Sequence, residues 1–591
     1  MAYSTSNAFN PKEAIQLVKI CPGDPDEEIC CTRRSVPFTG KDGPPKYNAL
    51  SYVWGDDKDT SGITLDNDPF DVTRNLYAAL RHLRDTGQTR NFWIDAICID
   101  QTNKEEQSEQ VKIMKQIYER AEVVVVWLTG HGGTKRGSAE ITKALDILVK
   151  EAEDMGDFGN LEAEPSRACK IRARVLDKFR QLVAADDTLL PWLECAFNNI
   201  YWNRVWTLQE FVSARQLLIQ CGDSTVDYQV WRRIVELIGQ IMNDVVSPQR
   251  NLIIRRTGQE AMESLPYIMG GTSIPAGKIP ALVKLCGLQN KSLGFRVQLR
   301  QHPENTIRLY DLLVESSEAD ATNKKDKIYS LVGLATACKV EVDYTEPLAE
   351  ICKRVTKCLI NEVDSLEPLR LGKAESPKEE GFPTWCPDWT LTHINWERHH
   401  FLPRTYHERR VQHSEYFCSS DSNVLTACGT CIGMIYNHAN VEGGDIRSEK
   451  SDDDVLKECI QQNLCPHEPE YEDYADKRGV SYKDALLDVL YLGKEVEEVH
   501  EGIMTSKSVY VARNGLITLF KTNKGYVGRA FDEVKDGDLI FCLRGSIAPC
   551  ILRRGKNGYT YVSQAYGRTT LPVLIVALPR TLTSLSARIY E

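Results

Sequence analysis

Residues 123–128 read Val-Val-Val-Val-Trp-Leu, an unbroken apolar run rich in β-branched side chains. A strand with one solvated face alternates apolar and polar residues, whereas a strand buried on both faces shows a continuous apolar run. Burial on both faces requires helices on each side of the sheet. The run therefore predicts the central strand of a parallel sheet in an α/β domain.

The sequence before this run alternates between strand and helix patterns. Segments Asn48–Trp54 and Asn91–Ile99 are apolar and β-prone, and each is followed by a stretch with apolar residues at helical spacing. Thr73 and Asn103 are expected to cap the two helices, because their side chains can accept hydrogen bonds from the first free amides. With a further strand at Gln216–Gln220, this alternation predicts a doubly wound sheet with helices on both faces.

The segment between the last two strands places a carboxylate on a helix. Residues 201–210 read Tyr-Trp-Asn-Arg-Val-Trp-Thr-Leu-Gln-Glu, so Glu210 follows Trp206 by about one helical turn. Folds of this class usually build ligand sites near the carboxyl ends of their strands. The alternative is a half-buried helix face on which the tryptophans are core residues and Glu210 is solvated, and these ten residues alone leave both interpretations open.

The length of the chain and the changes in its secondary-structure pattern indicate several domains. A chain of 591 residues is too long for one hydrophobic core. We expect an α/β domain at residues 1–225 with a helical insertion at about 130–200, and a mostly helical region at 226–380. A β-rich carboxyl-terminal domain is expected at 381–591, with a helical insertion near 445–500.

Composition limits the classes of partner. The net charge of −11, from 83 acidic and 72 basic residues, argues against a dominant nucleic-acid surface. No apolar run approaches the roughly 18 residues that a membrane span needs, and the amino terminus lacks the pattern of a secretory signal. The sequence therefore predicts a cytoplasmic protein with neither a nucleic-acid partner nor a membrane span.

The 19 cysteines are expected to be mostly reduced core residues, because no export signal accompanies them and several lie in apolar runs, such as Cys98, Cys358 and Cys542. Cys428-Gly-Thr-Cys431 has the spacing of a redox dithiol. Such a dithiol needs a helix amino terminus to lower its pKa, and this pair lies in a predicted strand. A zinc site would need a second, suitably spaced pair, so we predict neither a redox centre nor a metal site.

Four motifs, in order, resemble the fungal heterokaryon incompatibility (HET) domain. They are Tyr-Asn-Ala-Leu-Ser-Tyr-Val-Trp-Gly-Asp at 47–56, Phe-Trp-Ile-Asp-Ala-Ile-Cys-Ile-Asp-Gln at 92–101, Val-Val-Trp-Leu at 125–128 and Trp-Asn-Arg-Val-Trp-Thr-Leu-Gln-Glu at 202–210. Gln107 stands where this family usually has an arginine, so any role of that arginine is absent or displaced here.

HET domains are in turn thought to be distant relatives of TIR domains, and this resemblance implies a TIR-like, flavodoxin-like fold. In enzymatic TIR domains, a helix with the motif Trp-Cys-x-x-Glu carries the glutamate that cleaves the nicotinamide–ribose bond of NAD. The matching residues are Trp206, Thr207 and Glu210, so Glu210 is the candidate catalytic residue. NAD is then a substrate, and no cofactor is implied.

The chemistry suits a single carboxylate. Cleavage of the N-glycosidic bond builds positive charge on the ribose, which a carboxylate stabilises, and nicotinamide leaves without a general acid. For binding, Trp54 or Trp206 is placed to stack on a ring of the nucleotide. Gly55 and Asp56 are expected to form a loop over the site, and Asp95 lies towards the end of the second predicted strand.

Other residues in these motifs are assigned to the core. Tyr52, Trp93 and Trp127 are expected to pack in the interior. Glu106 is expected to complement the helix dipole at the amino terminus of its helix, although it and Asp95 are the next candidates if Glu210 is not catalytic.

The resemblance leaves two function hypotheses from different classes. The first is an NAD glycohydrolase (NADase) whose activity kills the cell. The second is a non-enzymatic TIR-like module that signals by self-association. Both imply programmed cell death in non-self recognition, an innate-immunity role, with a recognised partner that the sequence does not name.

Overall fold

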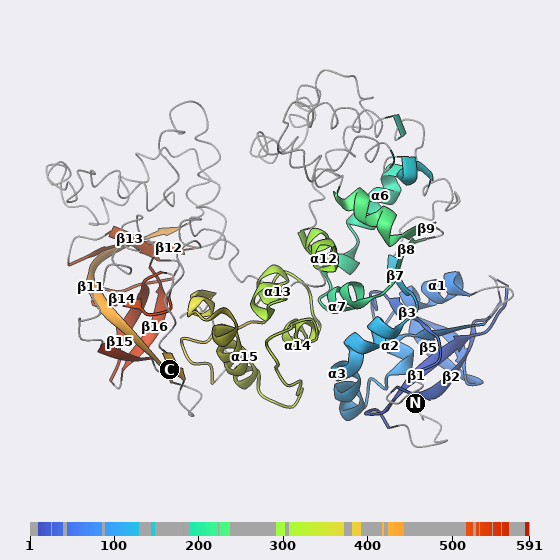
Figure 1. The fold of residues 1–591 in the computed structure, drawn as a ribbon, viewed down its shortest axis with the longest axis horizontal. Coiled ribbons are helices and arrows are strands. Elements are labelled where there is room, and N and C mark those ends of the chain that lie inside the picture. Colours follow the sequence, from blue (N-terminus) through green and yellow to red (C-terminus); the bar gives the residue numbers. More distant parts are fainter. Residues whose placement is uncertain are drawn as a thin grey trace. The chain divides into compact units, whose positions relative to one another are not determined.

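The computed structural model describes residues 10–24, 27–38, 44–84, 89–128, 143–147, 150, 181–182, 189–222, 224–236, 291–301, 307–371, 381–391, 416–418, 424–442, 516–523, 527–530, 532–546, 548–556, 558–565 and 585–589. The chain divides into two compact units (Figure 1). Unit 1 comprises Met1–Ile307, Glu318–Ala335 and Val342–Tyr344. Unit 2 comprises Arg308–Ser317, Thr336–Glu341 and Thr345–Glu591.

Unit 1 is built on a mixed sheet that has nine strands within the described residues. These are β1 (Ala14–Ile20), β2 (Cys30–Pro37), β3 (Asn48–Ser51), β4 (Thr60–Leu65), β5 (Asp68–Thr73), β6 (Arg90–Trp93), β7 (Val124–Leu128), β8 (Leu217–Cys221) and β9 (Ser224–Asp227). Their order in the sheet is β5-β4-β2-β1-β6-β3-β7-β8-β9. The four neighbouring strands β6, β3, β7 and β8 are mutually parallel, which confirms the parallel arrangement predicted for these four segments.

Antiparallel pairing extends this parallel core on both sides. Strand β1 pairs antiparallel with β6 and with β2, and β9 pairs antiparallel with β8. The complete sheet is therefore mixed, whereas the sequence predicted a parallel one.

Unit 1 includes the helices α1 (Arg74–Leu83), α2 (Asp95–Cys98), α3 (Lys104–Arg120), α6 (Leu189–Phe197), η2 (Ile200–Asn203), α7 (Trp206–Ser213), α12 (Lys291–Gln301) and α14 (Asp326–Val332). The two predicted amino-terminal caps are confirmed. The Thr73 hydroxyl accepts from the amide of Leu76 at 3.4 Å, and Asn103 Oδ1 accepts from the amides of Glu105 and Glu106 at 3.2 Å each.

The strand predicted at Asn91–Ile99 was too long. Strand β6 ends at Trp93, and the chain then makes the helical turn α2, in which the amide of Cys98 donates to the carbonyl of Ile94 at 2.8 Å. A short apolar run fits either a buried strand or a buried helical turn, so periodicity does not separate them. The Asp95 carboxylate favours the turn because its Oδ1 accepts from the amide of Ala96 at 2.8 Å.

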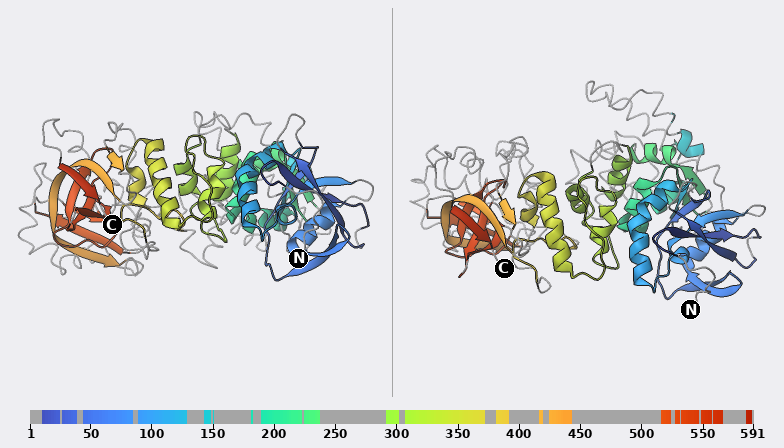
Figure 2. Two further views of the ribbon diagram at one scale, coloured as in Figure 1. Left: turned by 90° about the horizontal axis from the view of Figure 1, so that it is seen from below. Right: turned by 60° about the horizontal axis from the view of Figure 1, so that its bottom comes forward.

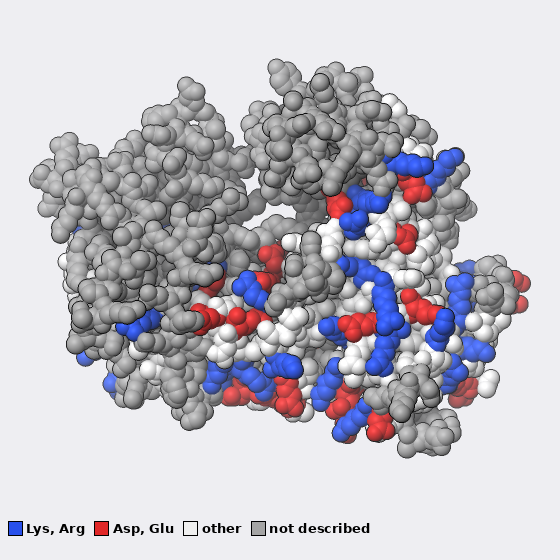
Figure 3. All heavy atoms as spheres, in the orientation of Figure 1, with Lys and Arg blue, Asp and Glu red and all other residues white. Residues whose placement is uncertain are grey.

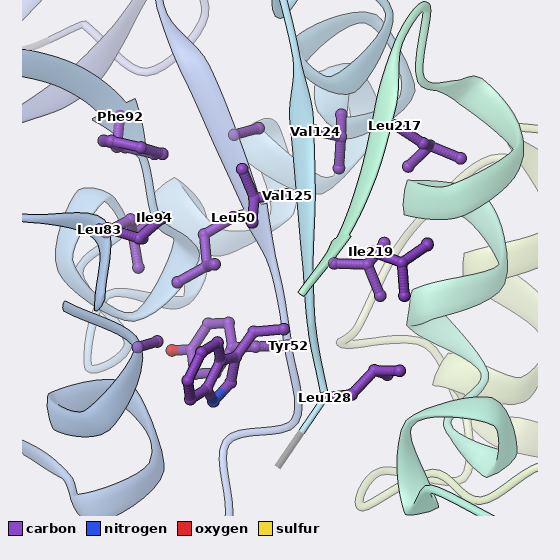
Figure 4. Packing of buried hydrophobic residues seen from close by; sticks show 14 of the residues in the cluster. Leu50, Tyr52, Leu83, Phe92, Ile94, Val124, Val125, Leu128, Leu217 and Ile219 are labelled. Carbon is purple, nitrogen blue, oxygen red and sulfur yellow. The ribbon is translucent and has the colours of Figure 1, made fainter. Parts of the chain in front are cut away.

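The parallel strands are buried as their composition predicts. All five residues of β7 are buried, which confirms it as a central strand. Figure 4 shows Leu50 of β3 and the following Tyr52 packed in the core with side chains of the neighbouring strands. Trp93 and Trp127 are also buried, with exposed fractions of 0% and 3%, so the prediction that they are core residues is confirmed.

Unit 2 contains helices and a second, β-rich sheet. Its elements are α13 (Leu309–Glu315), α15 (Leu348–Val363), η4 (Glu367–Leu371), β10 (Tyr416–Cys418), β11 (Leu425–Glu442), β12 (Leu516–Thr522), β13 (Val527–Ala530), β14 (Leu539–Leu543), β15 (Cys550–Arg554), β16 (Tyr559–Gln564) and β17 (Leu585–Ile589). Strand β17 pairs with both β16 and β11, so β11, β14, β15, β16 and β17 close into a ring (Figure 2). The prediction of a β-rich carboxyl-terminal region is confirmed.

The cysteines whose side chains the structure describes are free thiols, as predicted, except for one pair. Cys338 and Cys358 form a disulfide with their Cα atoms 5.9 Å apart, so Cys358 is not the reduced core residue expected. A compact fold can bring together two cysteines that sequence spacing does not mark as a pair. Cys428 and Cys431 are free thiols on β11, in the extended conformation predicted for them.

Two predicted insertions fall largely outside this description. Most of the helical insertion at residues 130–200, and all of that near residues 445–500, lies outside the described residues. None of the helices that the structure describes is long and apolar enough to cross a membrane. On the face drawn in Figure 3, basic and acidic side chains are interspersed over the described surface of unit 1.

Candidate functional site

Glu210 lies on the buried face of α7, against the carboxyl end of β3. Its side chain is only 4% exposed. Ser51, the last residue of β3, donates its hydroxyl to Glu210 Oε2 at 2.5 Å, and the Tyr201 hydroxyl lies 2.6 Å from the same serine oxygen. The solvated alternative for Glu210 is therefore wrong in this structure. The carboxyl, the serine hydroxyl and the phenol form one buried hydrogen-bonded chain.

A second tyrosine reaches this chain from α3. The Tyr118 hydroxyl donates to the carbonyl of Leu50 at 3.2 Å and interacts with the Glu210 carboxyl. Its ring packs edge-on against Trp93, with the centroids 5.3 Å apart. Elements β3, η2, α3 and α7 thus all contribute polar atoms around Glu210.

Their surroundings give the neighbouring carboxyls of Glu210 and Asp95 different pKa values. Burial and, to a smaller extent, the negative charge of Asp95 raise the pKa of Glu210 to about 8, against the opposing effects of the Ser51 hydroxyl and the Arg296 guanidinium. Burial raises the pKa of Asp95 to about 6, opposed by the hydrogen bond from Trp54. At neutral pH Asp95 is therefore mostly ionised while Glu210 is mostly protonated. Two carboxyls whose pKa values differ in this way can take different roles in one reaction.

Trp54 is hydrogen-bonded to Asp95. Its indole Nε1 donates to Asp95 Oδ2 at 2.7 Å, although 39% of the Trp54 side chain remains exposed. The nearby Tyr52 hydroxyl is buried and interacts with the Asp95 carboxyl, and the charges of Asp95 and Glu210 raise the pKa of this phenol beyond the effect of burial. Tyr52 packs in the core as predicted, but its hydroxyl is left beside two carboxyls.

The loop after β3 is held by contacts from its neighbours. Asn75 Nδ2 donates to the carbonyl of Val53 at 2.5 Å, and Trp127 Nε1 donates to Asn75 Oδ1 at 2.8 Å. Gly55 has φ +86°, a conformation that side chains disfavour, so glycine suits this turn. The exposed Asp56 accepts from the amide of Lys58 at 3.0 Å and so stabilises the same loop.

The structure thus brings three of the predicted site residues together: Trp54, Asp95 and Glu210. Trp206 instead interacts through its side chain with Asp326 at the start of α14, and Asp56 lies in the loop turn. Gly55 shapes the loop without contributing a side chain.

Glu106 has a structural contact. It is buried, and its Oε1 accepts from the amide of Asp100 at 2.9 Å, which ties the loop after α2 to the first turn of α3. This position agrees with its expected role at the helix amino terminus.

Sequence reasoning did not single out four residues of this environment: Ser51, Tyr118, Tyr201 and Arg296. Ser51 and Tyr201 lie inside or beside quoted motifs, so their polarity within apolar segments was an available signal. Arg296 lies on α12, far along the chain, and no local pattern connects it with Glu210.

The fold and site define a protein with an α/β domain in which a buried carboxyl on a helix is hydrogen-bonded to the last residue of a parallel strand. Residues 47–210 match the family model described as heterokaryon incompatibility protein (HET), and Glu210 is the last residue of that match. The chain is also 26% identical over 510 residues to heterokaryon incompatibility protein 6, OR allele, of Neurospora crassa, a match that covers 76% of this chain and 68% of that protein. No solved structure matches the chain.

Proposed function

We propose that this chain is an incompatibility-type cell-death effector whose unit 1 cleaves NAD at the nicotinamide–ribose bond through a TIR-like site centred on Glu210. The HET match and the incompatibility relative support the cell-death role. The catalytic step rests on one observation, the placement of Glu210 beside Ser51 at the carboxyl end of β3.

The topology of the parallel core supports this placement. Numbered along the chain, β3, β6, β7 and β8 take the spatial order 2-1-3-4, which is that of flavodoxin-like sheets. In such sheets ligands bind outside the carboxyl ends of the strands, where the strand order reverses. Here the order reverses at β3. Ser51 is the last residue of β3, while Trp54 and Asp95 follow the ends of β3 and β6.

The electrostatics fit a cationic substrate. Glu210 must be ionised to stabilise positive charge on the ribose, and its pKa of about 8 keeps most of it protonated at rest. The positive nicotinamide ring of bound NAD favours the ionised carboxylate. Ribose hydroxyls can donate to the carboxylate as the Ser51 hydroxyl does in this structure.

Full-length protein incubated with NAD, with and without forced clustering through a fused oligomerisation tag, tests the proposal by nicotinamide release. We expect Glu210→Gln to reduce the rate by about 10²–10³, the usual cost of losing one charge-stabilising group. Glu105→Gln, on the exposed first turn of α3, is the matched control. Undiminished release from Glu210→Gln would move the chemistry to Asp95 or Glu106.

A second candidate function is a non-enzymatic scaffold that acts by self-association. The observation in its favour is that Glu210 is buried and already occupied by Ser51, as expected of a structural carboxyl. Cell killing that persists in Glu210→Gln, together with no nicotinamide release from clustered protein, would establish this alternative. For either function we propose a cytoplasmic location.

A further inference from the structure

Helix α12 lies outside the HET segment in sequence, yet it holds the start of the helix that carries Glu210. Arg296, 1% exposed, donates from Nη2 to the carbonyls of Trp202 and Arg204 at 3.1 and 2.9 Å. Ser292, one turn earlier, donates to the same Trp202 carbonyl at 2.7 Å and accepts from Arg296 Nε at 3.3 Å. These carbonyls belong to the junction between η2 and α7, only a few residues before Glu210.

Arg300, one turn further along α12, holds the other end of α7. It donates from Nη1 to the carbonyls of Phe211 and Val212 at 3.2 Å each, and also to that of Ala214. The last carbonyls of a helix have no partner within the helix and carry partial negative charge, so a guanidinium is a favourable partner for them. The two arginines therefore bind backbone carbonyls at the two ends of α7.

The two arginines differ in their relation to Glu210. The Arg296 guanidinium lies 5.8 Å from the centroid of the Tyr201 ring, and its charge interacts with Glu210. Arg300 lies 4.7 Å from the centroid of the Tyr228 ring at the other end of α7. Burial lowers the pKa of Arg296 to about 10, so this side chain stays charged at neutral pH.

A buried guanidinium is costly unless its contacts are used, and Arg296 Nη1 has no partner among the described residues. A hydrophobic side chain would brace two helices without that cost. A hydrophobic residue, however, can neither donate hydrogen bonds to two backbone carbonyls nor place a positive charge beside Glu210.

We propose that α12 completes the Glu210 site and that Arg296 is its positioning residue, which fixes the η2–α7 junction so that Glu210 meets Ser51. The consequence for NAD cleavage rests on the proposed function, whereas the placement of Glu210 does not. The groups that face Glu210 are Ser51 of β3, Tyr52 after β3, Tyr118 of α3, Tyr201 of η2, Asp95 of α2 and Arg296 of α12.

Hydrogen–deuterium exchange of the full-length chain tests the placement without any activity. Arg296→Gln keeps hydrogen-bond donors but loses the positive charge and the planar, forked set of N–H groups of the guanidinium. Loss of the charge-assisted bonds to two carbonyls lets this junction open more often, so we expect at least about tenfold faster exchange of the amides at 202–208, which corresponds to about 1.4 kcal/mol or more. Arg300→Gln, the matched control, should accelerate only those at 213–217. Unchanged exchange at 202–208 in Arg296→Gln would overturn the proposal.

The pH profile of nicotinamide release separates positioning from simple bracing. Without the positive charge the Glu210 carboxylate is less favoured, so we expect the acidic limb of the Arg296→Gln profile to move up by about one pH unit. Arg296→Lys should restore the limb, and Arg300→Gln should leave it in place. If the acidic limb of the Arg296→Gln profile does not move although exchange at 202–208 becomes faster, Arg296 only braces the helix and its positioning role is overturned. Absence of release from the wild-type chain would contradict the proposed function, and the exchange result alone would then decide the role of α12.

Discussion

The hydroxyl of Ser51, at the end of β3, donates to Glu210 Oε2 on α7 at 2.5 Å, across 159 positions of sequence. Ser51 lies in the first HET motif and Glu210 closes the last. The contact therefore joins the two ends of the matched segment, and it ties the first strand of the parallel core to the helix that carries the candidate catalytic carboxyl.

Replacing Ser51 with alanine should destabilise unit 1. The change leaves the buried Glu210 carboxyl and the Tyr201 hydroxyl without this partner, and an unsatisfied buried polar group costs about 1–3 kcal/mol. Urea unfolding at neutral pH measures the loss. Ser108→Ala is the control, because that hydroxyl donates only to the carbonyl of Lys104 within α3 and its loss should stay within about 0.5 kcal/mol. Equal losses in the two variants would contradict a special role for the Ser51 contact.

Glu210→Gln should change how stability depends on pH. The pKa of Glu210 rises from its ordinary 4.5 to about 8 on folding, so between these values the folded chain holds a proton that the unfolded chain has released. The contribution of Glu210 to stability is therefore fully present below about pH 4.5 and is lost as pH rises through about 8.

In the Gln variant this loss is absent. Its stability relative to wild type should rise by a few kcal/mol from pH 5 to 8, since each unit of pKa displacement corresponds to about 1.4 kcal/mol. Thermal or urea unfolding across that range gives the difference, with Glu105→Gln as a control. A difference that does not vary with pH would show that Glu210 is ionised throughout the range.

Trp54 should report the ionisation of Asp95. Its indole donates to Asp95 Oδ2, and the pKa of that carboxyl is raised to about 6, so protonation weakens the acceptor near that pH. The fluorescence difference between wild type and Trp54→Phe isolates Trp54 from the other tryptophans and should titrate with a midpoint near pH 6. In an Asp95→Asn background the transition should vanish. Its persistence there would assign it to another group.

Much of the parallel core was predictable because its signals are local. The β-branched run at 123–128 marks a doubly buried strand, and Thr73 and Asn103 are polar residues placed where a helix needs a cap. The end of β6 was mispredicted because Asp95–Cys98 is apolar enough for either a strand or a helical turn, and a side-chain hydrogen bond decides between them.

The candidate site was predictable only in part. The motif resemblance led to Glu210, Asp95 and Trp54, which the structure brings close together. Neither the burial of Glu210 nor its partners could be read from its own helix, because Ser51 comes from a distant strand and Arg296 from a distant helix. The contact of Trp206 with Asp326 depends in the same way on α14, whose place in unit 1 follows from tertiary packing alone.

Cys428 and Cys431 should remain free thiols under mild oxidation. Three residues of extended strand separate their Cα atoms by roughly 10 Å, beyond the ~7 Å limit for a disulfide. Peptide mapping without reduction should find Cys338 linked to Cys358, whose Cα atoms are 5.9 Å apart, and no bridge within β11. A reversible bridge between Cys428 and Cys431 would require β11 to rearrange and would reopen a redox role.

A fragment of residues 1–225 should fold less stably than one of residues 1–345. The shorter fragment contains every HET motif but lacks α12 and α14, so the carbonyls of Trp202, Arg204 and Phe211 lose the arginines that hold them. The longer fragment keeps both helices, which belong to unit 1. Limited proteolysis and urea unfolding should therefore show cleavage near α7 and an earlier transition only for 1–225. Arg296→Gln combined with Arg300→Gln in the 1–345 fragment should move its transition towards that of 1–225. Equal stability of the two fragments would mean that α7 is held by the HET segment alone.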